Sequence, residues 1–376
     1  THSQTISASA TLEPIRDLRI DLTLNRNYTV NSSEYFRWND SAGVYQAQNK
    51  FEVANLSYTT ISIGSAFSGL SKDFTSKVFD KLRSNREAVS RSLGEGNSGS
   101  SAQTNGYYSG YGAGQQDVLI GSFLSAYTGS KPGKKGGANP LKNMPLPNWN
   151  ITYDGVSKLK FMKKLVQNFI VKHSYSSSVN ISGMQTNLQA VIKDGVPTTF
   201  NNNNDFISGR QIQNVSISER FAPLIGFDAT WNVRKNGLIT KFEINKDRTV
   251  SLAISNNQVT EMLGKEIVVG AGYKFGNVKL PFKVRGKNVI SDLIFRFDLS
   301  IRDNTTVIRK IIENTNQATS GQKVVSIRST LDYNLGQNIT LQLYYDQMIT
   351  KPKIATSYPT GNMNCGLRLR INLGGL

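Results

Sequence analysis

The sequence LIFRFDLSIR, residues 293–302, alternates between apolar and polar side chains. Successive side chains of a β-strand point to opposite faces, so this period of two predicts a strand with one apolar and one polar face. Other segments repeat the pattern, and together they indicate an all-β protein. They are residues 225–233, 267–275, 325–335, 339–345 and 363–373.

The lengths of these segments favour a membrane barrel over a soluble sandwich. Several expected strands run about 11–14 residues, whereas globular strands are most often about 5–6 long and a tilted transmembrane strand needs about 9–11. We expect about seventeen strands in all. Tight reversals are expected at four dipeptides, Asn236-Gly237, Gly276-Asn277, Gly286-Lys287 and Asp303-Asn304.

Composition agrees with a barrel wall. Hydrophobic residues make up 38% of the 376 residues, below the roughly 45–50% usual for globular proteins. A barrel strand needs only one apolar face, and no run of 18 apolar residues suggests a transmembrane helix. The expected fold class is therefore all-β, an antiparallel transmembrane outer-membrane β-barrel segment with one helix and loop insertion.

One region departs from the period of two. Residues 71–93 show apolar side chains near a spacing of 3.6 and predict a helix that begins after Ser71 and stops at Gly94. A Gly/Ser/Tyr-rich stretch, a short apolar helix at 117–127 and a Gly/Pro/Lys-rich loop follow. We expect barrel strands in residues 1–70, an insertion in 71–147 acting as a cap, plug or long loop, and strands in 148–373. Residues 374–376 are interpreted as a remnant of cloning.

The sequence contains few cysteines and histidines that could catalyse a reaction or bind a metal. Cys365 is the single cysteine, and the only histidines are His2 and His173. Cysteine-based zinc sites are excluded. His173 with Ser174 or Ser176 is one conceivable catalytic arrangement, but nothing near it resembles a nucleophile elbow. We expect no enzyme, no catalytic residue, no metal site and no cofactor.

The positive charge is spread along the chain. There are 44 Lys and Arg against 26 Asp and Glu, a formal net charge of +18. A nucleic-acid-binding protein would gather cations in one patch, so no nucleic acid is expected as a partner. An Arg facing the bilayer midplane costs roughly 2–4 kcal/mol, which assigns strand cations to the lumen. The predicted lumen-facing cations are Lys274, Arg296, Arg302, Arg328, Arg368 and Arg370.

Two features of the sequence do not distinguish a membrane barrel from a soluble sheet. A soluble sheet with one solvated face gives the same alternation. The aromatic residues near strand ends would suit either an interface girdle or a soluble core. These are Trp149, Tyr153, Trp231, Tyr273, Tyr344 and Tyr345.

Five stretches carry a resemblance to a known family. They are KVFDKLRSNREAVSRSLG (77–94), PNWNITYDGVSKLKFMKKL (147–165), DLIFRFDLSIRDNTTVIRKI (292–311), TSGQKVVSIRSTLDYNLGQNITLQLYYDQ (319–347) and SYPTGNMNCGLRLRINL (357–373). In these stretches the chain resembles the C-terminal portion of the SprA/Sov family. That family forms the outer-membrane translocon of the Bacteroidota type IX secretion system and is tied to gliding motility.

The resemblance implies a very large single-chain barrel, integral to the bacterial outer membrane, that exports folded proteins. The implied partners are the rest of the barrel, a shuttle barrel, a periplasmic plug protein, secreted passengers and outer-membrane lipid. The alternative is a self-contained porin or transporter of about 16–18 strands. The resemblance also implies a closing strand formed by Asn364, Cys365, Gly366, Leu367, Arg368, Leu369, Arg370, Ile371, Asn372 and Leu373.

Overall fold

A computed structural model describes residues 1–133, 143–233, 237–284, 287–335, 339–354 and 357–371. Most of the chain is strand. The strands are β1 (His2–Ile15), β2 (Leu18–Asn39), β3 (Val44–Thr59), β4 (Asn148–Tyr153), β5 (Val166–Thr186), β6 (Ile192–Lys193), β7 (Val196–Pro197), β8 (Arg210–Gln211), β9 (Asn214–Trp231), β10 (Leu238–Ala253), β11 (Gln258–Val284), β12 (Lys287–Lys310), β13 (Thr315–Asn334), β14 (Ile339–Pro352) and β15 (Thr360–Ile371).

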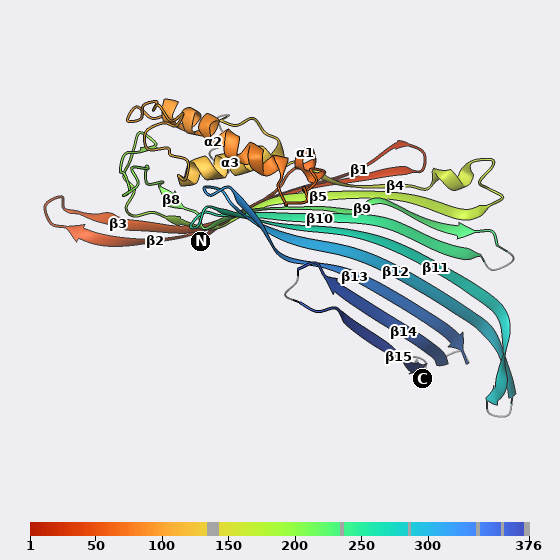
Figure 1. Ribbon diagram of the computed structural model, residues 1–376. Helices are drawn as coiled ribbons and strands as arrows, with labels where there is room; N and C mark the ends of the chain where they lie inside the picture. Colours follow the sequence, from red (N-terminus) through yellow and green to blue (C-terminus); the bar gives the residue numbers. More distant parts are fainter. Residues whose placement is uncertain (134–142, 234–236, 285–286, 336–338, 355–356, 372–376) are drawn as a thin grey trace.

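Thirteen of these strands form one antiparallel sheet (Figure 1). The order across the sheet is β1-β2-β3-β5-β9-β10-β11-β12-β13-β14-β15. The short strands β4 and β8 pair beside this path, and β6 and β7 form a separate two-stranded sheet. Most residues of each alternating segment lie in one of the long strands, so the expectation of an antiparallel all-β fold is confirmed.

Two of the expected reversals are wrong. Gly276 and Asn277 lie inside β11, where the register with β12 shifts between Phe275 and Val278. Asn277 has a φ of 55°, so this dipeptide forms a bulge within a continuing strand. Asp303 and Asn304 lie inside β12 and pair with β11 on one side and β13 on the other. The last residue of β11, Val284, pairs with the first residue of β12, Lys287, and the predicted reversal at Gly286-Lys287 includes Gly286, which lies outside the described residues.

The long insertion interrupts a single strand position of the sheet. β3 pairs with β5 over Val53–Thr59, and β4 pairs with β5 over Trp149–Tyr153, so β3 and β4 occupy the same place between β2 and β5. The Leu146 N–H donates to the Thr59 carbonyl at 2.9 Å, which holds the two ends of the excursion together. The excursion therefore covers residues 60–147 and begins before the expected residue 71.

The described residues of this insertion form three α-helices, α1 (Ile63–Ala66), α2 (Lys77–Glu95) and α3 (Gln116–Thr128). The expected helices correspond to α2 and α3, but α2 starts after Ser76, not after Ser71. Phe74, which fits the helical period, lies outside the helix with a φ of 58°. Among the residues that the structure describes, every helix is too short or too polar to cross a membrane.

The main core lies between the helices and one end of the sheet. α2 contributes Phe79 and Leu82, and α3 contributes Leu119 and Phe123. These side chains pack on buried residues of five strands, Leu56, Val179, Ile181, Ile217, Val250, Leu252 and Val259 among them. Figure 1 shows the three helices together over one side of the sheet.

The sheet is open. In the described part of the chain, β1 pairs only with β2 and β15 only with β14, so both are edge strands. We expected about seventeen strands, and the described residues form fifteen. Part of the difference arises because β11 continues through Gly276-Asn277 and β12 through Asp303-Asn304, both of which were predicted to be turns.

Candidate functional site: the two faces of the sheet

The register of the ladder assigns each side chain to a face, because directly paired residues of antiparallel strands lie on the same side. One row crosses six neighbouring strands and is entirely aliphatic. It runs through Ile225, Ile244, Ile267, Ile301, Val325 and Ile349. This row marks one border of an apolar surface, which we call the apolar belt.

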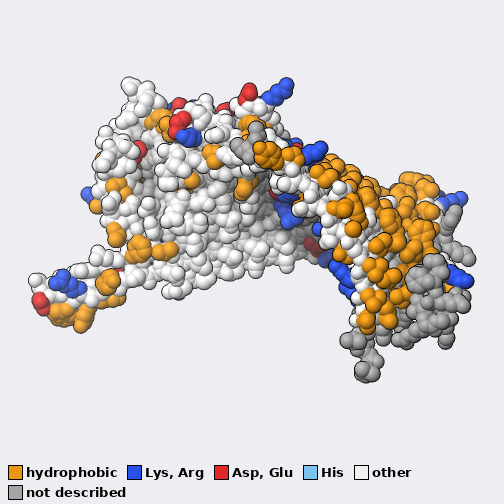
Figure 2. All heavy atoms as spheres, turned by 60° about the horizontal axis from the view of Figure 1, so that its bottom comes forward, with side chains coloured by type: hydrophobic (Ala, Val, Ile, Leu, Met, Phe, Trp, Pro, Cys, Tyr) orange, Lys and Arg blue, Asp and Glu red, His pale blue; other side chains and the backbone are white. Residues whose placement is uncertain are grey.

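The apolar belt continues for four more rows toward the opposite strand ends. The last of these on β11 and β12 pairs Phe275 with Leu293. On β11 the belt spans residues 267–275 and on β12 residues 293–301, nine residues in each case. Large side chains in it are exposed: Ile267 is 45% exposed, Leu343 51% and Leu367 66%. Figure 2 shows hydrophobic side chains gathered over a broad area of the molecule, with Lys and Arg along its border.

The far border of the belt carries aromatic side chains. Trp231 and Tyr273 both pair with Leu238, so they lie in one row. The other aromatic candidates are placed differently. Trp149 stacks near Tyr175 at 4.6 Å between centroids, at the border closest to the helices. Tyr153 and Tyr345 lie within the belt, and Tyr344 lies on the opposite face.

The border nearest the helices is a row of charges. Directly beyond the aliphatic row, Lys246 pairs with Lys265, Lys265 with Asp303, Asp303 with Lys323, and Lys323 with Lys351. We call these five residues the lysine row. Each occupies the apolar register of its strand but carries a charge, and sequence reasoning missed all five.

The six cations predicted to face a lumen all lie on the face opposite the belt. Lys274 and Arg368 share a row with Asp332, for example. This face is less basic than the sequence suggested, because acidic side chains accompany the cations. The pairs are Lys274–Asp292 at 2.5 Å, Arg296–Asp332 at 2.6 Å, Arg302–Asp247 at 2.8 Å and Arg328–Asp346 at 4.0 Å.

Arg368 and Arg370 belong to β15, which contains most of the predicted closing strand. Its odd-numbered residues Cys365, Leu367 and Leu369 lie on the belt side, and its even-numbered residues lie on the polar side. Cys365 is exposed. β15 is an edge strand, whose free backbone groups are available for a further strand. Asn372 and Leu373 of the predicted closing strand lie outside the described residues.

The helical insertion packs on the same face as the apolar belt. Val250 and Leu252, buried beneath the helices, share a side of β10 with Phe242 and Ile244 of the belt. The sequence predicted lumen-facing cations, and a plug was one of the three roles expected for the insertion beside a cap and a long loop. The cations and the insertion lie on opposite faces of the sheet, so lumen-facing cations and a plug cannot both hold. If the cations face a lumen, the insertion lies outside the wall.

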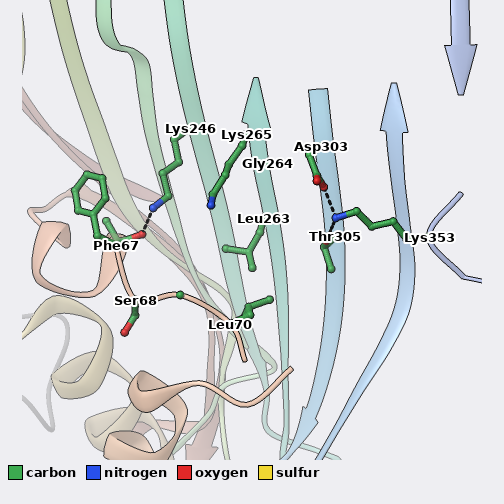
Figure 3. A pocket seen from close by; sticks show the side chains of 12 residues that line it. Phe67, Ser68, Leu70, Lys246, Leu263, Gly264, Lys265, Asp303, Thr305 and Lys353 are labelled. Atoms are coloured by element: carbon green, nitrogen blue, oxygen red, sulfur yellow. Dashed lines mark hydrogen bonds and ion pairs between the residues drawn. The ribbon is translucent and has the colours of Figure 1, made fainter. Parts of the chain in front are cut away.

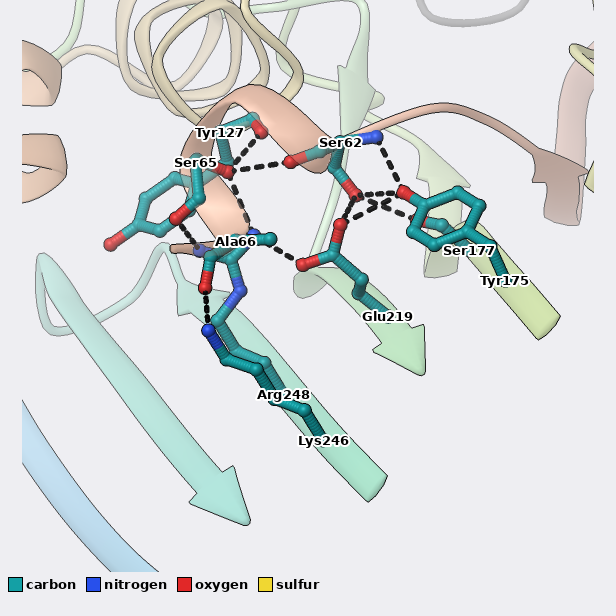
Figure 4. A network of polar contacts seen from close by, with 9 residues as sticks. All are labelled: Ser62, Ser65, Ala66, Tyr127, Tyr175, Ser177, Glu219, Lys246 and Arg248. Carbon is teal, nitrogen blue, oxygen red and sulfur yellow. Dashed lines mark hydrogen bonds and ion pairs between the residues drawn. The ribbon is translucent and has the colours of Figure 1, made fainter. Parts of the chain in front are cut away.

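A buried polar network fixes α1 to the sheet (Figure 4). Glu219 and Arg248 pair at 2.9 Å, with side-chain exposures of 2% and 3%. Glu219 accepts hydrogen bonds from the Tyr175 hydroxyl at 2.8 Å and the Ser62 hydroxyl at 3.1 Å. Arg248 donates to the Ser65 carbonyl at 2.8 Å and to its hydroxyl at 2.7 Å. The sheet thus holds α1 through both members of an ion pair.

A second buried pair lies under α2. Arg309 donates to Glu261 at 2.8 Å, and their side chains are 0% and 5% exposed. Its guanidinium also lies 5.6 Å from the centroid of the Phe79 ring. Between the two pairs, burial raises the pKa of the Tyr127 hydroxyl far above its ordinary value, and the nearby Glu261 carboxylate raises it further. Sequence reasoning missed both pairs because their residues interrupt the apolar register.

His173 is placed by packing. Its Nδ1 lies 2.6 Å from the Leu224 carbonyl, and its ring centroid lies 6.2 Å from that of Phe221. Ser174 and Ser176 alternate with it along β5 and therefore point to the other face of the sheet. The structure does not bring either serine to the His173 ring.

Comparison with known proteins adds no assignment. No protein-family model matches the chain. No curated protein matches it either.

Proposed function

We propose that this chain is part of the wall of a β-barrel in a bacterial outer membrane, and that the barrel is a protein-conducting translocon. The apolar belt carries the proposal. The eight steps of about 3.4 Å between the first and the ninth residue give it a length of about 27 Å along the strand, and a tilted membrane-spanning strand needs about 9–11 residues. Lysines border it on one side and aromatic residues on the other, as at a membrane interface.

The size of the belt argues against a soluble protein. Over β11–β15 alone, five strands about 4.8 Å apart and about 27 Å long present about 600 Å² of largely apolar surface. Soluble monomers rarely expose contiguous apolar patches larger than a few hundred Å². Lipid acyl chains would cover this surface without the cost of exposing it to water.

The two edge strands of the sheet support a wall that has more strands than this sheet. Backbone groups of an edge strand cannot stay unpaired in a membrane, because lipid offers them no hydrogen-bond partner. In the proposed translocon, further strands would therefore cover β1 and β15. The resemblance of five stretches to the SprA/Sov translocons supplies the matching architecture, a very large barrel of which this chain would form one part.

The two ends of the strands differ, which gives an orientation. The end that carries the insertion also carries the long connection between β5 and β9, residues 187–213, together with short connections such as residues 254–257 between β10 and β11. At the other end the β1–β2 and β11–β12 connections are short, and the connection between β4 and β5 covers residues 154–165. Outer-membrane barrels have short periplasmic turns and longer extracellular loops. The insertion would lie on the extracellular side, outside the wall, as a cap above the lipid.

The opposite face would line the pore. Ion-paired side chains such as Arg296 with Asp332 keep that face hydrated, and it offers little apolar surface to which a passing folded protein could adhere. The proposed partners are secreted passenger proteins, a shuttle barrel and a periplasmic plug, all taken from the family resemblance. The proposal assigns no chemical reaction to this chain, which would serve only as a pore wall. The energy for export would therefore come from other proteins.

Labelling of cysteines in intact outer membranes tests the proposal. Cys365 is the single cysteine of the sequence and lies on the belt side of β15, while its neighbour Asn364 lies on the polar side. A charged, water-soluble maleimide should leave Cys365 unmodified. The same reagent should label an Asn364→Cys variant that also carries Cys365→Ser. Detergent solubilisation should expose Cys365.

Equal labelling of both positions in the membrane would contradict the proposal, because a soluble sheet exposes both faces to water. A blot of fully denatured outer membranes with an antibody against residues 364–371 then separates the two kinds of barrel. A band far above the 41.5 kDa of this chain supports a giant translocon barrel. A band at 41.5 kDa supports a self-contained porin or transporter.

A further inference from the structure

The lysine row holds more positive charge than its protein partners neutralise. Lys246 and Lys265 lie directly opposite each other, as do Lys323 and Lys351. Like charges in such positions destabilise a sheet. In the described part of the chain, Lys265, Lys323 and Lys351 are exposed and form no ion pair, and Asp303 is the one acid of the row.

A pocket opens beside this row (Figure 3). It has a volume of 240 Å³ and lies between residues 66–70, which comprise the last residue of α1 and the four that follow it, and the belt-side face of β10–β12. Three lysines line it, Lys246, Lys265 and Lys353. Figure 3 shows the Lys246 and Lys265 side chains extending side by side from neighbouring strands, while Lys353 approaches Asp303 from the other side.

The ammonium groups of the three lysines differ in the protein groups that they already contact. The Lys246 ammonium donates to the Ala66 carbonyl and lies 4.3 Å from the centroid of the Phe67 ring. Lys353 is ion-paired with Asp303 and donates to the Thr305 hydroxyl at 3.0 Å. Lys265 makes no hydrogen bond or ion pair with described residues. Three cations and one acid leave the pocket with two positive charges and one free ammonium group.

The surroundings of the pocket specify what an anion there must carry. Ile244, Ile267 and Ile301 lie one row away in the belt, two residues along each strand from Lys246, Lys265 and Asp303. That spacing is about 7 Å. A ligand with a phosphate in the pocket and a hydrocarbon chain along the belt would satisfy both surfaces at once.

We propose that this pocket binds the phosphate of an anionic membrane lipid, with Lys265 and Lys353 as its principal cationic contacts and the acyl chains lying over the aliphatic row. The proposal rests on the proposed function, since it takes the belt as lipid-facing. Lys246 forms the wall of the pocket and keeps residues 66–70 in place. Lys323 and Lys351 extend the positive surface toward the next headgroups along the wall.

Binding of short-chain lipids to the native protein, purified from outer membranes in a non-ionic detergent, tests the proposal. The probes are dioctanoyl phosphatidylglycerol, dioctanoyl phosphatidylcholine and inorganic phosphate. Phosphatidylglycerol should bind more tightly than the zwitterionic lipid. A Lys265→Gln/Lys353→Gln variant should bind it about 30-fold more weakly, since each lysine near a membrane surface contributes about 1 kcal/mol and 1.4 kcal/mol corresponds to tenfold.

The matched control is Lys160→Gln/Lys163→Gln, which removes the same charge from exposed positions beyond the other border of the belt. It should change binding less than twofold. An equal loss in the control variant, no loss in the pocket variant, or competition by inorganic phosphate at the concentrations at which the lipid binds would each overturn the lipid site. If the double variant does not fold, Lys265→Gln alone should lose about fivefold, and Lys265→Arg should retain binding.

Failure of this inference is distinguishable from failure of the proposed function. A protein that resists extraction without detergent, yet binds phosphatidylglycerol equally well in all variants, keeps the membrane barrel and loses the lipid site. A protein released from membranes without detergent loses both.

Discussion

Glu219 on β9 and Arg248 on β10 lie directly opposite each other, and their carboxylate and guanidinium groups meet at 2.9 Å in the interior of the protein. Removing two charges from water is costly, and only good geometry and additional hydrogen bonds offset that cost. Ser62, Ser65 and Tyr175 supply those bonds. Because two of the three belong to the start of the insertion, the pair makes the position of α1 depend on the sheet.

Glu219→Ala should therefore loosen the insertion from the sheet. The substitution leaves the Arg248 charge buried without a partner, for which the expected loss is about 3–5 kcal/mol in the free energy of unfolding. Urea unfolding, together with the rate at which protease cleaves residues 60–133, measures the effect. Glu266→Ala is the control, because Glu266 is 24% exposed and lies 3.7 Å from Arg302. It should cost at most about 1 kcal/mol, and an equal loss in both variants would refute the role assigned to burial.

An arginine scan across one strand should separate the two faces of the sheet. Ile327 lies in the belt, and its neighbour Ser326 lies on the opposite face. In a membrane, Ile327→Arg should cost about 2–4 kcal/mol, whereas Ser326→Arg faces water and should cost little. The amount of folded protein in outer membranes and its unfolding by urea in vesicles report the difference. Similar losses for both variants would mean that the belt does not contact lipid.

The contact between Gly110 and Phe206 joins the insertion to the connection between β7 and β8. Gly110 has a φ of 79°, and a Cβ there would lie 2.2 Å from the Phe206 ring. Gly110→Ala should cost about 2–4 kcal/mol, from the left-handed backbone and the overlap with the ring together. Gly43→Ala is the control, with a φ of 63° and no atom within 4 Å of its Cβ. It should cost about 1–2 kcal/mol, so equal unfolding midpoints for the two variants would contradict the ring contact.

The strands could be predicted because their signal is local. Alternation such as Phe295, Arg296 and Phe297 is visible within one segment, and parity alone then places the predicted cations on one face. The beginning of the insertion could not be predicted, because residues 60–70 carry neither period. Asn277 looked like a turn because asparagine tolerates positive φ, but a bulge makes the same demand.

The lysine row and the buried ion pairs needed the register between strands. Lys265 and Lys323 each look like an isolated interruption of an apolar pattern, and they come together only through the pairing of β11 with β12 and of β12 with β13. The same holds for Glu219 and Arg248. A signal was present, since each of these charges occupies the apolar parity of its strand. It marks positions that depart from the apolar pattern, but not what these side chains contact instead.

Asp205 makes the free energy of unfolding depend on pH, and a single substitution can measure this contribution. Its Oδ1 accepts a hydrogen bond from the Gly112 N–H at 2.9 Å, and partial burial raises the pKa of this carboxyl above its ordinary value, an effect that the Gly112 bond only partly opposes. A folded-state pKa above the unfolded value of about 3.9 means that the folded state binds the proton more tightly. The contribution of Asp205 to stability is therefore greatest below the unfolded pKa and falls as the pH rises through the folded pKa.

Asp205→Asn keeps the acceptor oxygen without the charge, so the variant should be more stable than the native chain at pH 7, and the difference should shrink toward pH 4. The measurement is the difference in urea unfolding free energy between the two proteins across that range, which cancels the titration of all other groups. A difference that stays constant with pH would show that burial does not disfavour the charged form of Asp205.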